Sequence, residues 1–125
     1  MNTRVVVADD SAPYLELLVL VLGEEPWVEV VGTARDGVEA VHVALEQRPD
    51  AVLLDVDMPR LGGFGAAVQI RRLRPETLLL LHTGAFVEEA RRRGEQLDLP
   101  VRGKDELAKT VAELAQPPWR LGLTA

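Results

Sequence analysis

The chain contains no cysteine among its 125 residues. Disulfides and thiolate-based metal or redox sites are therefore excluded, and the composition is compatible with a reducing compartment such as the cytoplasm. The longest apolar run, residues 17–22, is too short to span a bilayer. The apolar run near the N-terminus is too short for a signal peptide and soon meets Asp9. We expect a cytoplasmic protein without a membrane segment.

An excess of basic residues is also missing, because 14 Lys and Arg stand against 20 Asp and Glu and give a net charge of −6. Nucleic-acid phosphates require a basic face, so we expect no direct nucleic-acid binding by this domain. The length and a hydrophobic content of 47% fit one soluble core. We expect a single domain over residues 1–116 and a C-terminal tail or linker stub over residues 117–125.

Short apolar runs alternate with segments of helical period along the chain, which predicts an α/β fold. The runs are nearly continuous, as in a parallel sheet covered by helices on both faces. Ser11 and Asp36 stand where helix N-caps are expected. The predicted strands are residues 5–8, 28–31, 51–54, 78–81 and 101–103, and the predicted helices are residues 14–22, 38–45, 64–73, 85–94 and 107–115.

Two of these elements are the least regular. Pro100 cannot donate to a sheet, so we expect the last strand to be short. The segment 85–94 has few apolar anchors and carries three consecutive arginines, Arg91, Arg92 and Arg93, so we expect a short or mobile helix. The arginines are interpreted as a solvated helix face, with docking of an acidic partner helix as the alternative.

Chemically active residues stand where the predicted strands end. Asp9 and Asp10 follow the first strand, Asp55 and then Asp57 follow the third, Thr83 follows the fourth, and Lys104 follows the fifth. Ligands of open parallel sheets bind beyond these strand ends. Crowded carboxylates imply a bound ion or a shared proton, and a hard, oxygen-rich site without His or Cys ligands suits Mg²⁺. His82, beside Thr83, is interpreted as a packed or rim histidine without a role.

The acidic pair, the stretch from Leu53 to Pro59 followed by Gly62 and Gly63, then Thr83 with Gly84, and Lys104 resemble the signature of response-regulator receiver domains (CheY-like) of two-component signalling. The resemblance covers nearly the whole chain. It implies a three-layer, doubly wound (βα)5 flavodoxin-like fold with five parallel strands in the order 2-1-3-4-5. It also implies a sensor histidine kinase as phosphoryl donor and an output protein or effector domain as partner.

The same resemblance assigns roles to single residues. Asp55 would be the phosphoacceptor, and Thr83 and Lys104 would bind the phosphoryl group. Mg²⁺ would be held by Asp10, Asp55 and the backbone carbonyl of Asp57, with Asp9 assisting through water. The domain would be no turnover enzyme on external substrates, although it could lose its own phosphoryl group to water.

The sequence departs from the family at the position three before the lysine, where an aromatic residue is usual and Val101 stands. In the family that ring couples phosphorylation to the output face. An alternative function is therefore a phosphorylation-independent pseudo-receiver that binds its partner constitutively. A phosphatase of the haloacid-dehalogenase type is a further alternative, because Asp55 and Asp57 match its paired aspartates. Against it, that pair follows the first strand in such enzymes and the third strand here.

The helix predicted at residues 14–22 is apolar on more than one face, with Glu16 nearly its only charged or strongly polar residue. Such a helix requires cover on both sides. We therefore expect a homodimer through this helix or a partner that docks over it.

Overall fold

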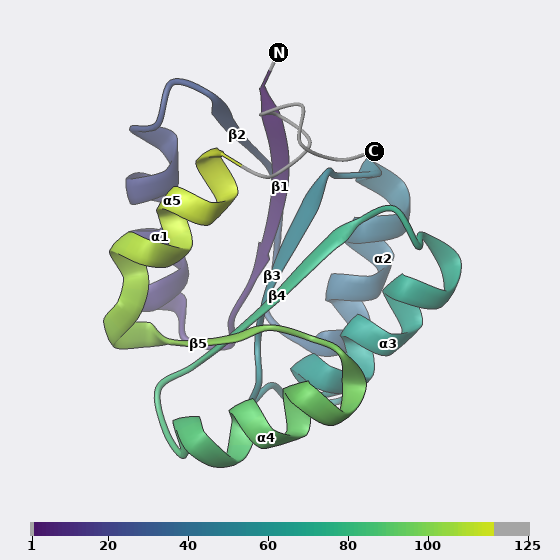
Figure 1. The fold of residues 1–125 in the computed structure, drawn as a ribbon. Coiled ribbons are helices and arrows are strands. Elements are labelled where there is room, and N and C mark those ends of the chain that lie inside the picture. The colour runs from purple at the N-terminus through teal and green to yellow at the C-terminus, as the bar shows by residue number, and fades with distance from the viewer. Residues whose placement is uncertain (1, 117–125) are drawn as a thin grey trace.

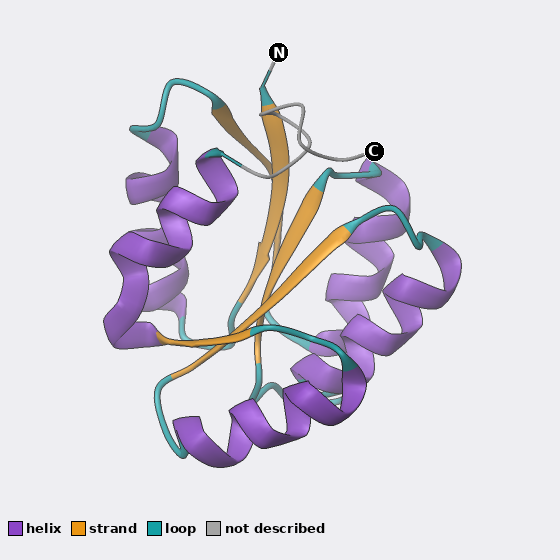
Figure 2. Ribbon diagram, viewed as in Figure 1, coloured by secondary structure: helices purple, strands orange, loops and turns teal. Residues whose placement is uncertain are grey.

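The computed structural model describes residues 2–116, which form one parallel sheet between two layers of helices (Figures 1 and 2). The sheet has five strands in the order β2-β1-β3-β4-β5. This confirms the three-layer (βα)5 fold and the predicted strand order. The strands are β1 (Thr3–Ala8), β2 (Val28–Ala34), β3 (Ala51–Asp55), β4 (Leu78–Thr83) and β5 (Val101–Gly103).

The helices fill the connections between the strands. They are α1 (Ala12–Gly23), α2 (Gly37–Gln47), α3 (Gly63–Leu73), α4 (Val87–Leu97) and α5 (Leu107–Ala115), with a 3₁₀ turn, η1 (Lys104–Glu106), before α5. Helices α1 and α5 cover one face of the sheet, and α2, α3 and α4 cover the other (Figure 1). No helix within residues 2–116 is long and apolar enough to cross a bilayer.

The predicted caps are present. The Ser11 hydroxyl accepts the backbone N–H of Tyr14 at 3.3 Å, and the Asp36 carboxylate accepts that of Glu39 at 2.8 Å. Each bond satisfies an N–H that the first helical turn leaves without a partner. Strand β5 has three residues, as expected after Pro100.

Helix α4 corrects one prediction, because it has 11 residues and ends at Leu97, not at Gly94. Its few apolar residues suffice because Ala90 is buried and Gly94 packs closely on the chain before β5. Arg91 is also not simply solvated, since it forms ion pairs with Glu88 and with Glu106 beyond β5. Arg92 and Arg93 are exposed, as predicted.

A close backbone approach at Gly63 sets the position of the start of α3 beside the sheet. Gly63 opens α3 directly against β3, and a Cβ atom there would lie 2.2 Å from the backbone oxygen of Asp55. The Gly63 N–H donates to the carbonyl of Val56 at 3.0 Å. Glycine is therefore required for α3 to begin this close to the end of β3.

Helix α1 keeps the apolar outer row that the sequence indicated. Leu15, Leu18 and Leu22 are buried against the sheet. On the opposite side Leu17 is 40% exposed and Leu20 is 63% exposed. The predicted tail at residues 117–125 lies outside the described residues, so its boundary stays a prediction.

Candidate functional site

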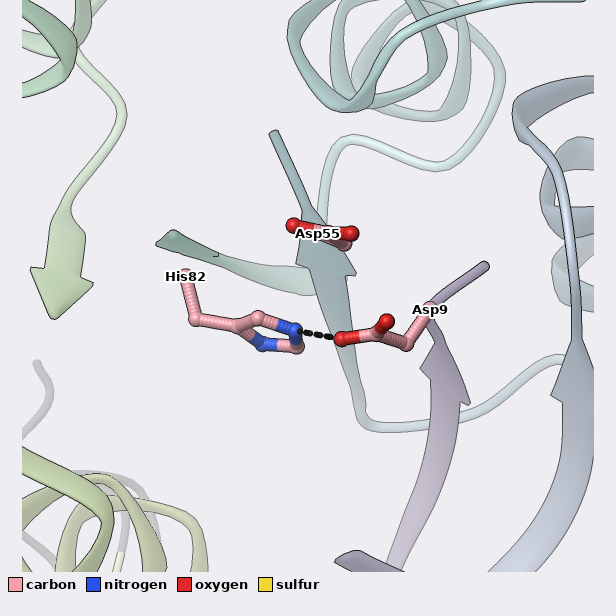
Figure 3. A group of neighbouring side chains, drawn as sticks. All are labelled: Asp9, Asp55 and His82. Atoms are coloured by element: carbon pink, nitrogen blue, oxygen red, sulfur yellow. Dashed lines mark hydrogen bonds and ion pairs between the residues drawn. The ribbon is translucent and has the colours of Figure 1, made fainter. Parts of the chain in front are cut away.

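The carboxyl ends of β1, β3, β4 and β5 meet at one edge of the parallel sheet. Asp9 directly follows β1, and Asp55 is the last residue of β3. His82 and Thr83 end β4, and Lys104 directly follows β5. All of these strands are parallel, so their final residues converge, as Figure 3 shows for three of them. The structure thus brings Asp9, Asp55 and Lys104 into contact and places Thr83 at the same edge of the sheet.

Asp9 is fully buried and accepts three hydrogen bonds. Its Oδ1 accepts the backbone N–H of Ser11 at 2.8 Å. Its Oδ2 lies 2.8 Å from His82 Nε2 and 2.7 Å from Lys104 Nζ. Burial raises the pKa of Asp9, but the bonds from His82, Lys104 and Ser11 outweigh it and lower this pKa to about 2. Asp9 is therefore a carboxylate at neutral pH.

Asp55 is buried at 3% exposure and has weaker partners. Its Oδ1 lies 3.7 Å from Lys104 Nζ and accepts the backbone N–H of Asp57 at 3.5 Å. Burial and the charge of Asp9 raise the pKa of Asp55 to about 7, against the lowering effect of Lys104. A hydrogen bond with the Asp10 side chain raises this pKa further. Asp55 is therefore the carboxylate whose charge is least offset.

This raised pKa predicts a pH-dependent stability difference between the native chain and Asp55→Asn without divalent metal. The folded protein binds the Asp55 proton more tightly than the unfolded chain, whose pKa is near 3.8. The contribution of Asp55 to folding is therefore present below about pH 4 and is lost as the pH rises through 7. Asparagine does not titrate. As the pH rises to 8, we expect the free energy of unfolding of Asp55→Asn to increase relative to that of the native chain by about 1 to 3 kcal/mol.

Urea unfolding with EDTA at pH 5, 6, 7 and 8 measures this difference. A stability gap between the two proteins that does not change with pH would contradict the raised pKa of Asp55.

Tyr14 contacts Lys104 through both its ring and its hydroxyl. The Lys104 ammonium lies 4.4 Å from the centroid of the Tyr14 ring, and the Tyr14 hydroxyl donates to the backbone oxygen of Lys104 at 3.4 Å. Burial, Asp9 and Asp55 together raise the pKa of Tyr14 to about 12, so its hydroxyl stays protonated. The ring therefore directs the ammonium toward the two carboxylates by a cation–π contact.

Thr83 is buried at the rim, but its hydroxyl is engaged within its own loop. The Thr83 Oγ1 donates to the Ala85 carbonyl at 2.8 Å and accepts the Ala85 N–H at 3.3 Å. Phe86 follows in a left-handed conformation with φ of 51° and is 78% exposed. Val101, at the position where the family has an aromatic residue, is buried and packs near Gly94.

No role for His82 follows from the sequence pattern, yet its ring is 2% exposed and bonds Asp9 directly. The interpretation as a packed histidine is right, and what it missed is the contact with the site. Tyr14 was missed altogether. For His82 the position beside Thr83 at the strand end was an available signal. The contacts of Tyr14 join the first turn of α1 to Lys104, which follows β5, and no local pattern indicates that these two residues meet.

The residues at this edge fit a hard divalent cation. Asp10, next to Asp9, and Asp57, two residues beyond the buried Asp55, are exposed. The raised pKa of Asp55 indicates that Lys104 offsets its charge only in part. Carboxylate oxygens are the ligands that hard divalent cations prefer. Ligand atoms of Asp9, Asp55 and His82 also lie within 4.8 Å of one another. In that triangle, however, Asp9 Oδ2 already accepts from Lys104 and His82.

Comparisons with known proteins agree with this geometry. The model of the response regulator receiver domain matches residues 5–112. A protein-glutamate methylesterase/protein-glutamine glutaminase of Thermotoga maritima is 36% identical over 117 residues, covering 90% of this chain and 34% of that protein. The protein of the same name from Symbiobacterium thermophilum is 42% identical over 78 residues, covering 62% of this chain and 22% of that protein. The chain thus spans roughly a fifth to a third of the length of these relatives.

Solved structures show the same fold. The response regulator domain of Thermotoga maritima CheB superposes with a TM-score of 0.81 at 28% identity over the whole of both chains. The signal receiver domain of the putative response regulator NarL from Mycobacterium tuberculosis gives a TM-score of 0.83 at 30% identity, covering 93% of this chain and 98% of that one. The residues at the strand ends, the strand order and these matches together show that the chain belongs to the response regulator receiver domain family.

Proposed function

We propose that this receiver domain accepts a phosphoryl group on Asp55 from a phosphohistidine of a sensor histidine kinase. A carboxylate oxygen of Asp55 attacks phosphorus, the bond from phosphorus to the histidine nitrogen breaks, and that nitrogen keeps the electron pair. The observation that carries the proposal is the position of Asp55, which is buried at the end of β3 and faces the Lys104 ammonium at 3.7 Å.

The neighbouring groups support this assignment. Lys104 lies where it can neutralise an oxygen of the incoming phosphoryl group, because its ammonium already contacts both buried carboxylates. Thr83 would contribute its hydroxyl after giving up the bonds to Ala85. The Asp57 side chain, exposed two residues beyond Asp55, would stand near the path of an attacking water.

Magnesium is the cofactor that these oxygen donors favour. We assign its direct ligands as Asp10, Asp55 and the backbone carbonyl of Asp57, with Asp9 assisting through water. The bound ion would offset the negative charge that Asp55 and the phosphoryl group bring together.

A phosphorylation-independent binding module is the less supported alternative. This alternative was based on Val101, which stands in β5 at the position where the family usually has an aromatic residue. The acceptor Asp55, the cation Lys104 and the hydroxyl Thr83 are all present at one edge, and a constitutive binding module has no use for them. The phosphatase alternative is not supported either, because Asp55 ends β3 within a receiver fold.

The test is labelling of the purified chain with acetyl phosphate, followed by intact-mass measurement with and without Mg²⁺. We expect an Mg²⁺-dependent gain of about 80 Da, the mass of one phosphoryl group, and no gain in Asp55→Asn. The Asp57→Asn variant is the matched control, since it loses a neighbouring carboxylate and keeps the acceptor. A folded chain that gains no mass, or one that gains the same mass in Asp55→Asn, would refute the proposal.

The partners follow from the receiver role. We propose a sensor histidine kinase as donor and an output protein or effector domain as target, in the cytoplasm, with no direct binding of nucleic acid or membrane. The similar methylesterases are much longer than this chain, so an enzymatic activity of that kind would belong to an effector part and not to these residues. A homodimer through α1 stays a prediction, supported by the exposed Leu17 and Leu20, and its test is the molar mass in solution.

A further inference from the structure

His82 is the buried residue at the site for which phosphoryl acceptance supplies no role. It comes from β4, and its ring extends toward the carboxylate of Asp9, the residue that follows β1 (Figure 3). Its ring packs against Tyr14 with the centroids 5.6 Å apart and the planes tilted by 54°. The Nδ1 atom is buried and has no hydrogen-bond partner within the described part of the chain. Within residues 2–116, the polar contact of this ring goes to Asp9.

This contact occupies a specific place on the Asp9 carboxylate. A carboxylate oxygen offers about two lone-pair positions. The Asp9 Oδ2 accepts from both His82 Nε2 and Lys104 Nζ, so both positions are filled, while within residues 2–116 the Oδ1 accepts from Ser11. Without the imidazole, Oδ2 would have a free position directed at whatever cation or water lies nearby.

The imidazole donates this bond from Nε2. Asp9 is a carboxylate and can only accept, so the proton in the 2.8 Å contact must be on Nε2. Burial lowers the pKa of His82, and the Lys104 charge lowers it as well, although Asp9 acts in the opposite direction. The bond disperses negative charge of Asp9.

We propose that His82 is a positioning residue that fills one acceptor position of Asp9 and thereby weakens the attraction of the site for a divalent cation. A hydrogen-bond donor that stabilises an ionised carboxylate weakens the attraction of this carboxylate for a proton. It weakens the attraction for a metal cation as well, since both attractions depend on the same negative charge. The histidine keeps the pair of Asp9 and Lys104 in place before a cation binds. This inference rests on the proposed function, because it concerns the Mg²⁺ that phosphoryl acceptance would use.

The experiment compares His82→Met with His82→Gln in the full chain at pH 8. Methionine fills a similar volume without a donor, whereas the amide nitrogen of glutamine reaches about as far as Nε2 and can donate to Asp9. We expect His82→Met to bind Mg²⁺ about 3- to 10-fold more tightly than the native chain, and His82→Gln to stay within about twofold of it. Mg²⁺ titration followed by NMR chemical shifts gives the Kd independently of any phosphorylation.

A second measurement separates this role from a loss of packing. In an Asp9→Asn background the acceptor charge is gone, so His82→Met should leave the Mg²⁺ affinity unchanged. Should His82→Met not fold, His82→Leu takes its place in both backgrounds. Equal or weaker Mg²⁺ binding by the apolar variants, or the same effect from His82→Gln, overturns the inference. A native chain that binds no Mg²⁺ instead refutes the proposed function, so the two failures are distinguishable.

Discussion

Lys104→Met is expected to lower the rate of Mg²⁺-dependent phosphoryl labelling by about 100- to 1,000-fold, the scale found when one preorganised charge is removed from a transition state. Lys104 is the cation that contacts both Asp9 and Asp55. Methionine keeps much of the length and apolar stem but removes the ammonium. The carboxylates would then lose the group that offsets their repulsion and that would meet the phosphoryl oxygens.

The same substitution is expected to destabilise the folded chain at pH 8 by about 2 to 4 kcal/mol, because it leaves Asp9 buried with one charged partner fewer. Lowering the pH toward 6 should recover part of this loss, since Asp55 can then take up a proton. Acetyl-phosphate labelling rates and urea unfolding measure the two effects.

Lys109→Met is the matched control for this prediction. It removes the same charge from the other lysine of the chain, which is exposed on α5. Labelling and stability should both stay near native values. If Lys104→Met were labelled as fast as Lys109→Met, the ammonium would have no part in phosphoryl acceptance.

Gly63→Ala is expected to lower the free energy of unfolding by about 3 kcal/mol or more. The new Cβ would lie 2.2 Å from the Asp55 backbone oxygen and 2.9 Å from Leu81 Cδ1. The first of these contacts is with backbone, so it can be relieved only by moving α3 away from β3. That movement would also shift Asp55, and we expect slower labelling even where the variant is folded.

Gly23→Ala provides the comparison, because a Cβ at this helix end meets nothing within 4 Å. Its stability should be unchanged or higher by about 0.5 kcal/mol, as alanine is the better helix former. Denaturant unfolding at 25 °C with EDTA measures both variants. Equal stability of the two proteins would show that α3 can move aside without cost.

The fold could be predicted almost completely from the alternation of apolar runs and helical segments. The ends of the elements were less certain where side chains did not dictate them. Strand β2 continues to Ala34, three residues beyond its apolar run, because its last three residues, 32–34, pair with Val6, Val7 and Ala8 of β1. Helix α4 is longer than its weak apolar pattern indicated, since the ion pair of Arg91 with Glu106 and the packing of Gly94 come from elsewhere in the fold.

For the site, the sequence indicated which residues would meet but not how they would share partners. That Asp9, Asp55 and Lys104 stand at strand ends follows from the pattern. Lys104 and His82 both donate to one oxygen of Asp9, and Lys104 Nζ lies 2.7 Å from Asp9 but 3.7 Å from Asp55. The charge of Asp55 is therefore less well offset. Such differences depend on the three-dimensional packing of side chains from separate strands, which local sequence does not encode.

The bonds of the Thr83 hydroxyl to its own loop have a thermodynamic consequence. Before any phosphoryl group arrives, this hydroxyl is already paired with the Ala85 backbone. If the Thr83 hydroxyl turned to a phosphoryl oxygen, it would give up its hydrogen bonds with Ala85 and form a new hydrogen bond in their place. Exchange between two satisfied states has a small free-energy difference, so modest inputs of about 1 to 3 kcal/mol suffice to shift the population of the loop. A signal stored in this way is easily reversed.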